Sequence, residues 1–534
     1  MGQLSIVAKL GYGVGHVLND LCSSLWFTYL LIFLNKVERI PNTLAGVVLL
    51  VGQVADGIST PFVGTQADRT DDTVFCIKYG RRKTWHLAGT IFVTIAFPFI
   101  FMGCLGCALS EAALQVLYLA PFVVIFQFGW AAVQISHLAL IPALTSEPHE
   151  RTELNAIRYA FTVFSNITVY LITWLVLGVQ SGHQREDIIG PNDATTFKIV
   201  VASVVCLGLL FSLVFHMTVK ENNHQSPYAS IISDDIDEEG DNSLQSASVQ
   251  SASSASSYHS QHYASSVSRM LPSDWFKKKQ FYLVAVLYMC TRLFCNLTQA
   301  YVPIYLQDTL ELSPQSVAYI PLTMYVSGFI TTTIAIKPIN VKFGRKVSYA
   351  LGSLLGAGGC VWIFFGSGEL YCQYLVYPVA VLLGAGGSTM LVTSLSITAD
   401  LIGNNIESGA FVYGAMSFTD KLSNGIAIMV IQYFSPYSPI CKHCIEYYRY
   451  ILAFVGGGTC VAGALSVLLL VTTIIKRAPQ SGLSTTSSGG LNERICPDDG
   501  ASSNLLLPAG EDDSDTAEHH TYLGPALSAS TTEA

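Results

Sequence analysis

The chain has 534 residues, of which 51% are hydrophobic and only 12% are charged, and its mean hydropathy is +0.45. Soluble proteins carry about 25% charged residues, so this composition excludes an ordinary soluble enzyme and a disordered acidic scaffold. Thirteen cysteines are too few for a disulfide-stapled module. The net charge of −9 gives no reason to expect a nucleic-acid partner. The composition therefore indicates a polytopic membrane protein.

The sequence contains a series of apolar stretches that are long enough to cross a bilayer, which takes about 20 mostly apolar residues. In chain order the predicted spans are 12–34, 43–63, 85–106, 114–141, 156–178, 197–219, 281–305, 316–337, 346–366, 372–397, 409–433 and 450–475. They fall into two sets of six, so we expect an all-α integral membrane protein with two six-helix bundles, 1–219 and 281–477. The Ser-rich and acidic segments 220–280 and 478–534 cannot bury enough apolar surface to fold, and are predicted to be a disordered linker and tail.

The distribution of Lys and Arg predicts the orientation in the membrane, because cytosolic connections carry an excess of both. The two ends, the linker and the connections on their side hold 20 of these residues, and the opposite connections hold six. Both termini, the linker and the tail are therefore predicted to be cytosolic. By this count only Arg292 and Lys421 remain inside spans, which makes them the first candidates for function.

Each half carries a basic turn after its second span, and this shared placement suggests a duplicated transporter. The turns hold Asp68, Arg69 and Arg81 in the first half and Arg345 in the second. Simple anchoring by positive charge explains them equally well from charge alone. The alternative is that these four residues help to hold a cytosolic gate shut in one state.

Ionisable side chains inside a span are expected to have a role, because each costs about 2.5–3.5 kcal/mol at the bilayer centre. Asp20 and Asp56 lie about 11–12 Å from the cytosolic ends of their spans, and Arg292 and Lys421 about 16–18 Å. Two acids from one half and two bases from the other are thus expected to meet across a central cavity. The alternatives are helix-to-helix ion pairs and, for Lys421, a structural pair with the adjacent Asp420.

Two pairs of cysteines, Cys104/Cys107 and Cys441/Cys444, are predicted to lie at the non-cytosolic face, where disulfides are allowed. We favour structural disulfides or free thiols there over a metal site. No metal, no cofactor and no arrangement of catalytic groups is predicted, so the chain is not expected to be an enzyme.

Several sequence stretches resemble the glycoside–pentoside–hexuronide:cation symporter family of the major facilitator superfamily, the group of melibiose permease. They are LGYGVG at 10–15, DGISTPFVG at 56–64, DRT at 68–70, GR at 80–81 and IPALTSEPHERTELNAIR at 141–158, together with Lys421. The resemblance covers most of both halves. It implies the major facilitator fold and transport by alternating access.

The resemblance places Asp20 at a sugar-binding acid of melibiose permease, and Asp56 and Lys421 at its cation-site residues. The chain departs from that pattern at three positions: Gln53 replaces an arginine, and Thr60 and Gln134 each replace an acid. These changes remove ligand charge from a sodium site and weaken the case for a sugar.

A narrower resemblance to one animal branch of the superfamily rests on GHVLNDLC at 15–22, WFTYLL at 26–31, FQFGW at 126–130, QISH at 134–137, RYAFT at 158–162, SGAFVYG at 408–414 and DK at 420–421. It implies a carrier of lysosomal and melanosomal membranes that imports cysteine into the lumen and so supports pigment synthesis.

A zwitterionic solute suits the remaining charges better than a sugar. We expect Asp20 to bind the ammonium group of cysteine and Arg292 its carboxylate, with hydrogen bonds from Gln134 and Asn296. Asp56, near Lys421, is the candidate for proton coupling. The competing hypotheses are a cation-coupled sugar or lysolipid symporter, and a transport-inactive sensor or scaffold. Sorting adaptors are expected to bind the linker, where Tyr228 begins a short tyrosine-based signal, and the Leu505–Leu506 pair in the tail is a second short candidate signal.

Overall fold

The computed structural model describes residues 4–69, 79–106, 111–145, 147–180, 188–221, 272–403, 409–436 and 446–475. Most of the predicted linker and the whole of the predicted tail lie outside these residues, as do both short sorting signals.

The described residues of the first half are helical almost throughout, with short breaks between the helices. The helices are α1 (Ile6–Gly13), η1 (Val14–His16), α2 (Val17–Ile32), η2 (Phe33–Val37), α3 (Asn42–Arg69), α5 (Arg81–Ile100), α6 (Ala112–Leu144), α7 (Pro148–Gln180), η3 (Pro191–Asp193) and α8 (Ala194–Thr218). The first four follow one another directly and together form the first predicted span.

The second half repeats this plan after the short helix α10 (Pro272–Trp275). Its helices are α11 (Lys279–Asp308), α12 (Ser316–Ile330), η4 (Thr331–Ala335), α13 (Ile336–Phe343), α14 (Arg345–Phe365), η5 (Tyr371–Leu375), α15 (Val376–Ile402), α16 (Gly409–Tyr433), α18 (Tyr447–Tyr450), η7 (Ile451–Gly456) and α19 (Gly457–Ile475).

These helices fill the twelve positions at which spans were predicted. Within the part of the chain that the structure describes, ten helical segments are long and apolar enough to cross a membrane, and the other two positions hold α5, of 20 residues, and α16, of 25 residues. Several helices extend beyond the predicted apolar stretches. The helix at the fifth predicted span, α7, begins at Pro148 rather than near 156. The polar residues that precede the apolar stretch are therefore helical as well.

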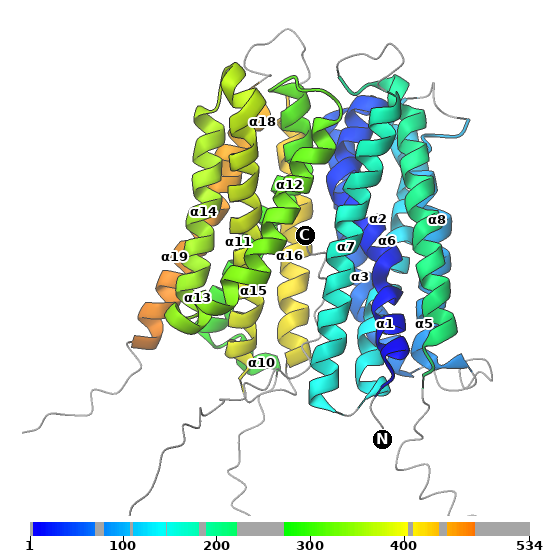
Figure 1. Cartoon of the computed structure of the whole chain (residues 1–534), viewed down its shortest axis with the longest axis vertical. Coiled ribbons are helices and arrows are strands. Elements are labelled where there is room, and N and C mark those ends of the chain that lie inside the picture. Colours follow the sequence, from blue (N-terminus) through cyan, green and yellow to red (C-terminus); the bar gives the residue numbers. More distant parts are fainter. Residues whose placement is uncertain are drawn as a thin grey trace, which may run out of the picture.

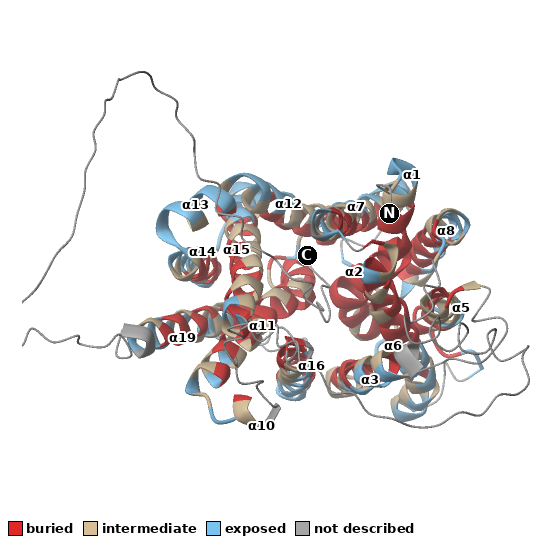
Figure 2. Ribbon diagram, turned by 90° about the horizontal axis from the view of Figure 1, so that it is seen from below, coloured by how far each residue is buried: buried red, intermediate tan, exposed pale blue. Residues whose placement is uncertain are grey.

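The helices stand side by side in two groups, with α1 to α8 in one group and α11 to α19 in the other (Figure 1). The N-terminus lies at the lower ends of the helices, where α5 begins at Arg81 and α14 at Arg345. We call this lower face the basic face. Figure 2 views the molecule from that face and shows buried residues concentrated where helices of each group meet.

The first span is enclosed by other helices along most of its length. Every residue from 11 to 34 is buried, and Figure 2 shows α2 surrounded by its neighbours. Polar residues of α2 such as Asn19, Asp20 and Thr28 therefore face protein rather than lipid. Enclosure explains how one helix can carry these side chains at membrane depth, where lipid would leave them without partners.

Polar contacts join the two groups near the face opposite the basic face. Lys36 Nζ lies 2.5 Å from Asp308 Oδ1, and the Tyr29 hydroxyl donates to the Val317 carbonyl at 3.1 Å. Nearer the middle, Gln299 Nε2 donates to the Thr28 hydroxyl at 3.1 Å. The two groups are thus held together from the middle of the helices to the face opposite the basic face.

Close packing of α5 on α6 depends on a pair of glycines. A Cβ atom at Gly89 would lie 2.6 Å from the Gly129 carbonyl oxygen, and one at Gly129 would lie 2.9 Å from the Gly89 carbonyl oxygen. Small residues of this kind let membrane helices approach closely.

We expect Gly89→Ala to destabilise the protein by about 1–3 kcal/mol, because the added methyl group meets backbone atoms that cannot move aside. Thermal unfolding of the purified protein in detergent measures this effect. Gly358→Ala is the matched control, because a Cβ atom there meets nothing within 4 Å. Equal melting temperatures for the two variants would contradict the expectation.

Candidate functional site

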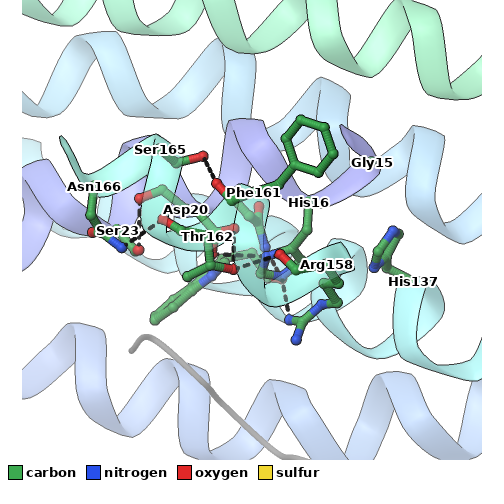
Figure 3. Close-up of polar contacts among 12 residues, drawn as sticks. Gly15, His16, Asp20, Ser23, His137, Arg158, Phe161, Thr162, Ser165 and Asn166 are labelled. Carbon is green, nitrogen blue, oxygen red and sulfur yellow. Dashed lines mark hydrogen bonds and ion pairs between the residues drawn. The ribbon is translucent and has the colours of Figure 1, made fainter. Parts of the chain in front are cut away.

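Asp20 accepts hydrogen bonds from two side chains of its own half (Figure 3). His16 Nδ1 lies 2.9 Å from Asp20 Oδ1, and the Thr162 hydroxyl donates to Oδ2 at 2.9 Å. Arg158 Nη2 lies 3.3 Å from His16 Nε2. Since arginine can only donate, Nε2 must accept, which leaves Nδ1–H to donate to Asp20.

Arg158 is a buried charge that the sequence analysis missed. It is only 6% exposed, although it was counted with the cytosolic basic residues because it lies near the start of the fifth predicted span. The signal was present in the sequence, since Arg158 falls inside that span and precedes Thr162 by one helical turn.

The two halves share a buried ion pair between Asp56 of α3 and Lys421 of α16. Lys421 Nζ lies 2.8 Å from Asp56 Oδ2 and donates to the Thr60 hydroxyl at 2.9 Å. Thr60 in turn donates to Asp56 Oδ1 at 3.1 Å. Both charged side chains are at most 5% exposed. The expected meeting of an acid and a base across the halves therefore occurs at this pair.

Arg292 pairs within its own half rather than across the halves. Its Nε donates to Asp420 Oδ2 at 3.1 Å, and both side chains are 3% exposed. Asn424 Nδ2 donates to the other carboxylate oxygen of Asp420 at 2.5 Å. The sequence analysis named Asp420 only as an alternative partner of Lys421. Neighbouring residues on a helix do not face each other, and Asp420 instead turns toward α11.

These two ion pairs lie close enough to form one cluster. Asp420 interacts electrostatically with Lys421 and Asp56 as well as with Arg292. The cluster thus contains two carboxylates and two cations, and its formal charges cancel. Buried charges arranged in this way are costly to separate, because removing one partner leaves the other without compensation.

The Asp20 and Arg292 side chains lie at similar depth on facing helices. The bond between Thr28 and Gln299 marks a common level of α2 and α11. Asp20 precedes Thr28 by eight residues and Arg292 precedes Gln299 by seven. At about 1.5 Å per residue, the two charges lie about 12 Å and about 10 Å from that bond toward the basic face.

The two predicted amides are both buried, one in each half. Gln134 of α6 is 2% exposed and Asn296 of α11 is 5% exposed. Among the residues that the structure describes, Gln134 Nε2 has no hydrogen-bond partner. A buried donor of this kind carries an unmet desolvation cost, so it is suited to donate to a solute.

A small, partly open pocket lies between α7 of the first half and α11, α12 and α15 of the second. Its lining is mostly apolar and includes Tyr170, Tyr325, Cys295, Gln299 and Ser388. Cys295 and Gln299 lie on α11 within two turns of Arg292, on the side away from the basic face. Ligand pockets typically combine an apolar lining with a few polar groups, as this one does.

The four predicted gate residues lie at the basic face, and the structure describes the side chains of two of them. Asp68 and Arg69 end α3, and their side chains are outside the described set. Arg81 begins α5 and is half-buried. Arg345 forms an ion pair with Asp400 of α15 and donates to the Ser396 carbonyl at 3.3 Å.

We expect Arg345→Gln to change stability by only about 0.2–1 kcal/mol, because exposed ion pairs contribute little. The two side chains are 32% and 57% exposed. Measuring the melting temperature and the transport rate of one preparation separates two roles. A gate residue would alter the rate with little change in melting temperature, whereas an anchoring residue would leave the rate unchanged.

Of the two predicted cysteine pairs, the structure describes one residue, Cys104. Cys104 is disulfide-bonded, and its partner lies outside the described residues, as do Cys441 and Cys444. Within the described ranges, no group of three or more His, Cys, Asp or Glu side chains is arranged to hold a metal ion.

Helices in two groups around buried ion pairs are the arrangement of a solute carrier, and comparison with known proteins agrees. The chain matches the family described as MFS/sugar transport protein over residues 11–232 and 249–477. It is 44% identical over 489 residues to Major facilitator superfamily domain-containing protein 12 of Homo sapiens, covering 89% of this chain and 95% of that protein. The Mus musculus protein of the same name is 44% identical over 479 residues, covering 88% and 94%.

Among solved structures, the fold is similar to that of the xylose transporter XylE from E. coli in a partially occluded inward-open conformation. The TM-score is 0.54 at 14% sequence identity, with 89% of this chain and 98% of that chain covered. The chain therefore belongs to the major facilitator superfamily, in the MFS/sugar transport protein family. It is a multi-pass membrane transporter, and its relatives and structural neighbours are transporters rather than enzymes. The predicted fold class is confirmed.

Proposed function

We propose that this transporter imports cysteine into lysosomes and melanosomes by alternating access, with both termini in the cytosol. The basic face is then the cytosolic face, as the positive-inside rule predicts. The location and the substrate follow from the resemblance to the animal branch described above.

The observation that carries the substrate proposal is the pair of opposite charges on facing helices, Asp20 on α2 and Arg292 on α11, at similar depth. An α-amino acid presents an ammonium and a carboxylate group, which match these two charges. In this structure each charge already has a partner in its own half, His16 with Thr162 for Asp20 and Asp420 for Arg292. Cysteine would exchange these partners for its own groups, with hydrogen bonds from Gln134 and Asn296.

The ion pair between Asp56 and Lys421 suits a coupling role, because it joins the two halves and is buried. A proton on Asp56 would neutralise one member of the pair. The attraction between α3 and α16 would then weaken, and the halves could separate more readily. In this way protonation and the change between open states would be linked through one carboxylate.

The measurement that tests the function in the cell is the cysteine content of purified lysosomes with and without the protein, at controlled lumenal pH. We expect lower lumenal cysteine when the protein is absent. Unchanged cysteine would contradict the proposed substrate. A scaffold that signals through the linker is tested in the same assay by deleting residues 230–270, since a carrier should still move solute without them.

A cation-coupled sugar symporter is the second candidate, favoured by the description of the matched family as MFS/sugar transport protein. Position 60 holds Thr and position 134 holds Gln, whereas the resemblance to melibiose permease leads one to expect acids there. Competition between labelled cysteine and unlabelled sugars for uptake distinguishes the two functions.

A further inference from the structure

Four histidines from four different elements lie between Asp20 and the basic face. They are His216 of α8, His86 of α5, His137 of α6 and His16 of η1. Three of them, His86, His137 and His16, are at most 1% exposed, and His216 is half-buried near the end of its helix. Histidine is the side chain whose ordinary titration range lies closest to neutral pH, so a buried row of them is suited to moving protons.

The row begins near the basic face, where two histidines are hydrogen-bonded to each other. The Tyr79 hydroxyl lies 2.7 Å from His216 Nδ1, and His216 Nε2 lies 3.2 Å from His86 Nδ1. The other ring nitrogen of His86 lies 2.9 Å from the Gly15 carbonyl oxygen. These contacts connect the end of α8 to the turn of η1 that carries His16.

The row continues to Asp20 through His137. The ring centroids of His86 and His137 are 5.9 Å apart, and those of His137 and His16 are 5.6 Å apart. His16 Nδ1 then contacts Asp20 at 2.9 Å. Figure 3 shows His137 beside the cluster of His16, Asp20 and Arg158. A proton could cross each of the two gaps by rotation of an imidazole ring.

His137 has one nitrogen available for such a transfer. Its Nε2 lies 2.8 Å from the Tyr12 carbonyl oxygen, to which only an N–H can donate, so Nδ1 carries the lone pair. Among the described residues, Nδ1 has no hydrogen-bond partner. A proton arriving at Nδ1 would therefore break no existing bond.

The row is flanked by two cations and two phenols, and the Glu221 carboxylate lies beside one of the cations, Lys83, whose backbone N–H donates to it at 3.1 Å. Arg158 lies beside His16 and interacts electrostatically with His137. Lys83 interacts with His86 and His216, and donates to the Val219 carbonyl at 2.6 Å. Tyr12 stacks on His137 with ring centroids 4.2 Å apart, and Tyr79 bonds to His216. Cations near both ends of the row disfavour a resident proton, which suits a path for transit rather than a storage site.

From this geometry we propose that His216, His86, His137 and His16 carry protons between the cytosolic face and Asp20. Asp20 binds a proton and the ammonium group of the solute alternately, so that each displaces the other. Toward the cytosol, each step moves one proton from the Asp20 carboxyl O–H or from an imidazole N–H to the lone pair of the next ring nitrogen, with no redox change. At His16 the first step requires Nε2 to leave Arg158 and carry the ring hydrogen, so that Nδ1 presents its lone pair to Asp20. This inference rests on the proposed function, and it makes the carrier an exchanger of cysteine for protons.

The direction of transport follows from this competition. In an acidic lumen a proton displaces the ammonium group from Asp20 and releases the solute. After the carrier reopens to the cytosol, the proton leaves along the histidines, and Asp20 can bind the next solute. An acidic lumen would thus drive accumulation of cysteine against its gradient.

The test uses the full-length protein in proteoliposomes with radiolabelled cysteine under reducing conditions. Two measurements are compared: accumulation driven by an acidic interior, and exchange of labelled for unlabelled cysteine at equal pH on both sides. We expect His137→Gln to lower gradient-driven accumulation at least tenfold while exchange stays within twofold of the unmodified protein. His86→Gln is a second variant with the same expectation, and exposed His149→Gln is the matched control.

The possible outcomes separate this inference from the proposed function. If either variant keeps full gradient-driven accumulation, the histidine path is wrong. If both variants are folded but lose exchange as well, the histidines serve solute movement itself, and the path is again wrong. If the unmodified protein exchanges cysteine but ignores the pH gradient, the inference fails while the proposed function stands. If the unmodified protein moves no cysteine, the proposed function itself fails.

Discussion

Replacing Asp56 by asparagine should destabilise the protein by about 3–5 kcal/mol, because it leaves the buried Lys421 ammonium without its counter-ion. The Lys421 side chain is 5% exposed, and its other hydrogen-bond partner is the neutral Thr60 hydroxyl. The neutral pair Asp56→Asn with Lys421→Gln removes both charges, so we expect most of the lost stability to return. Thermal unfolding of the purified variants measures both effects.

Transport should respond differently from stability in the same variants. The double variant keeps a joined interface but has no titratable carboxylate at position 56, so we expect its uptake to stay at least tenfold below that of the unmodified protein. Glu369→Gln is the matched control, because that carboxylate is exposed and accepts a hydrogen bond from the neutral Gln373 amide, away from both ion pairs. If the double variant were as active as the unmodified protein, Asp56 and Lys421 would have no coupling role.

Replacing Arg292 by glutamine should lower cysteine uptake by about 10- to 1,000-fold, because a charge-assisted contact to a carboxylate contributes about 1.5–3 kcal/mol and its loss also unpairs a buried group. The difficulty is that Arg292 also compensates Asp420. A loss of uptake in the single variant would fit either a solute contact or a structural ion pair.

The double variant Arg292→Gln with Asp420→Asn separates these two roles of Arg292. It removes both buried charges, so we expect the melting temperature to recover from that of the single variant. If Arg292 binds the solute carboxylate, uptake stays low despite this recovery. Recovery of uptake along with stability would show that Arg292 serves only as the partner of Asp420.

Contacts set by helix geometry could be predicted from the sequence. His16 and Asp20 are four residues apart on one helical face, and they are hydrogen-bonded in the structure. Acids of the first half and bases of the second were expected to meet across a central cavity, and Asp56 and Lys421 form an ion pair between the halves. The spans themselves were predictable, because about 20 apolar residues in a row have few alternatives to crossing a membrane.

Contacts set by packing between distant helices could not be predicted. Asp420 turns away from its neighbour Lys421 and toward Arg292, a choice that depends on how α16 rotates against α11. His86 and His216 are 130 residues apart in the chain, yet they are hydrogen-bonded. Nothing in the sequence gives the relative register of α5 and α8. Arg158 was missed for a simpler reason, since counting Lys and Arg by connection hides a charge just inside a span.

The most direct test of the proposed function is uptake of radiolabelled cysteine by proteoliposomes that contain the purified full-length protein. We predict saturable uptake above that of protein-free liposomes, with unlabelled cysteine competing and a disaccharide in excess not competing. Uptake no greater than in protein-free liposomes, from protein shown to be folded and able to carry a sugar instead, would contradict the account.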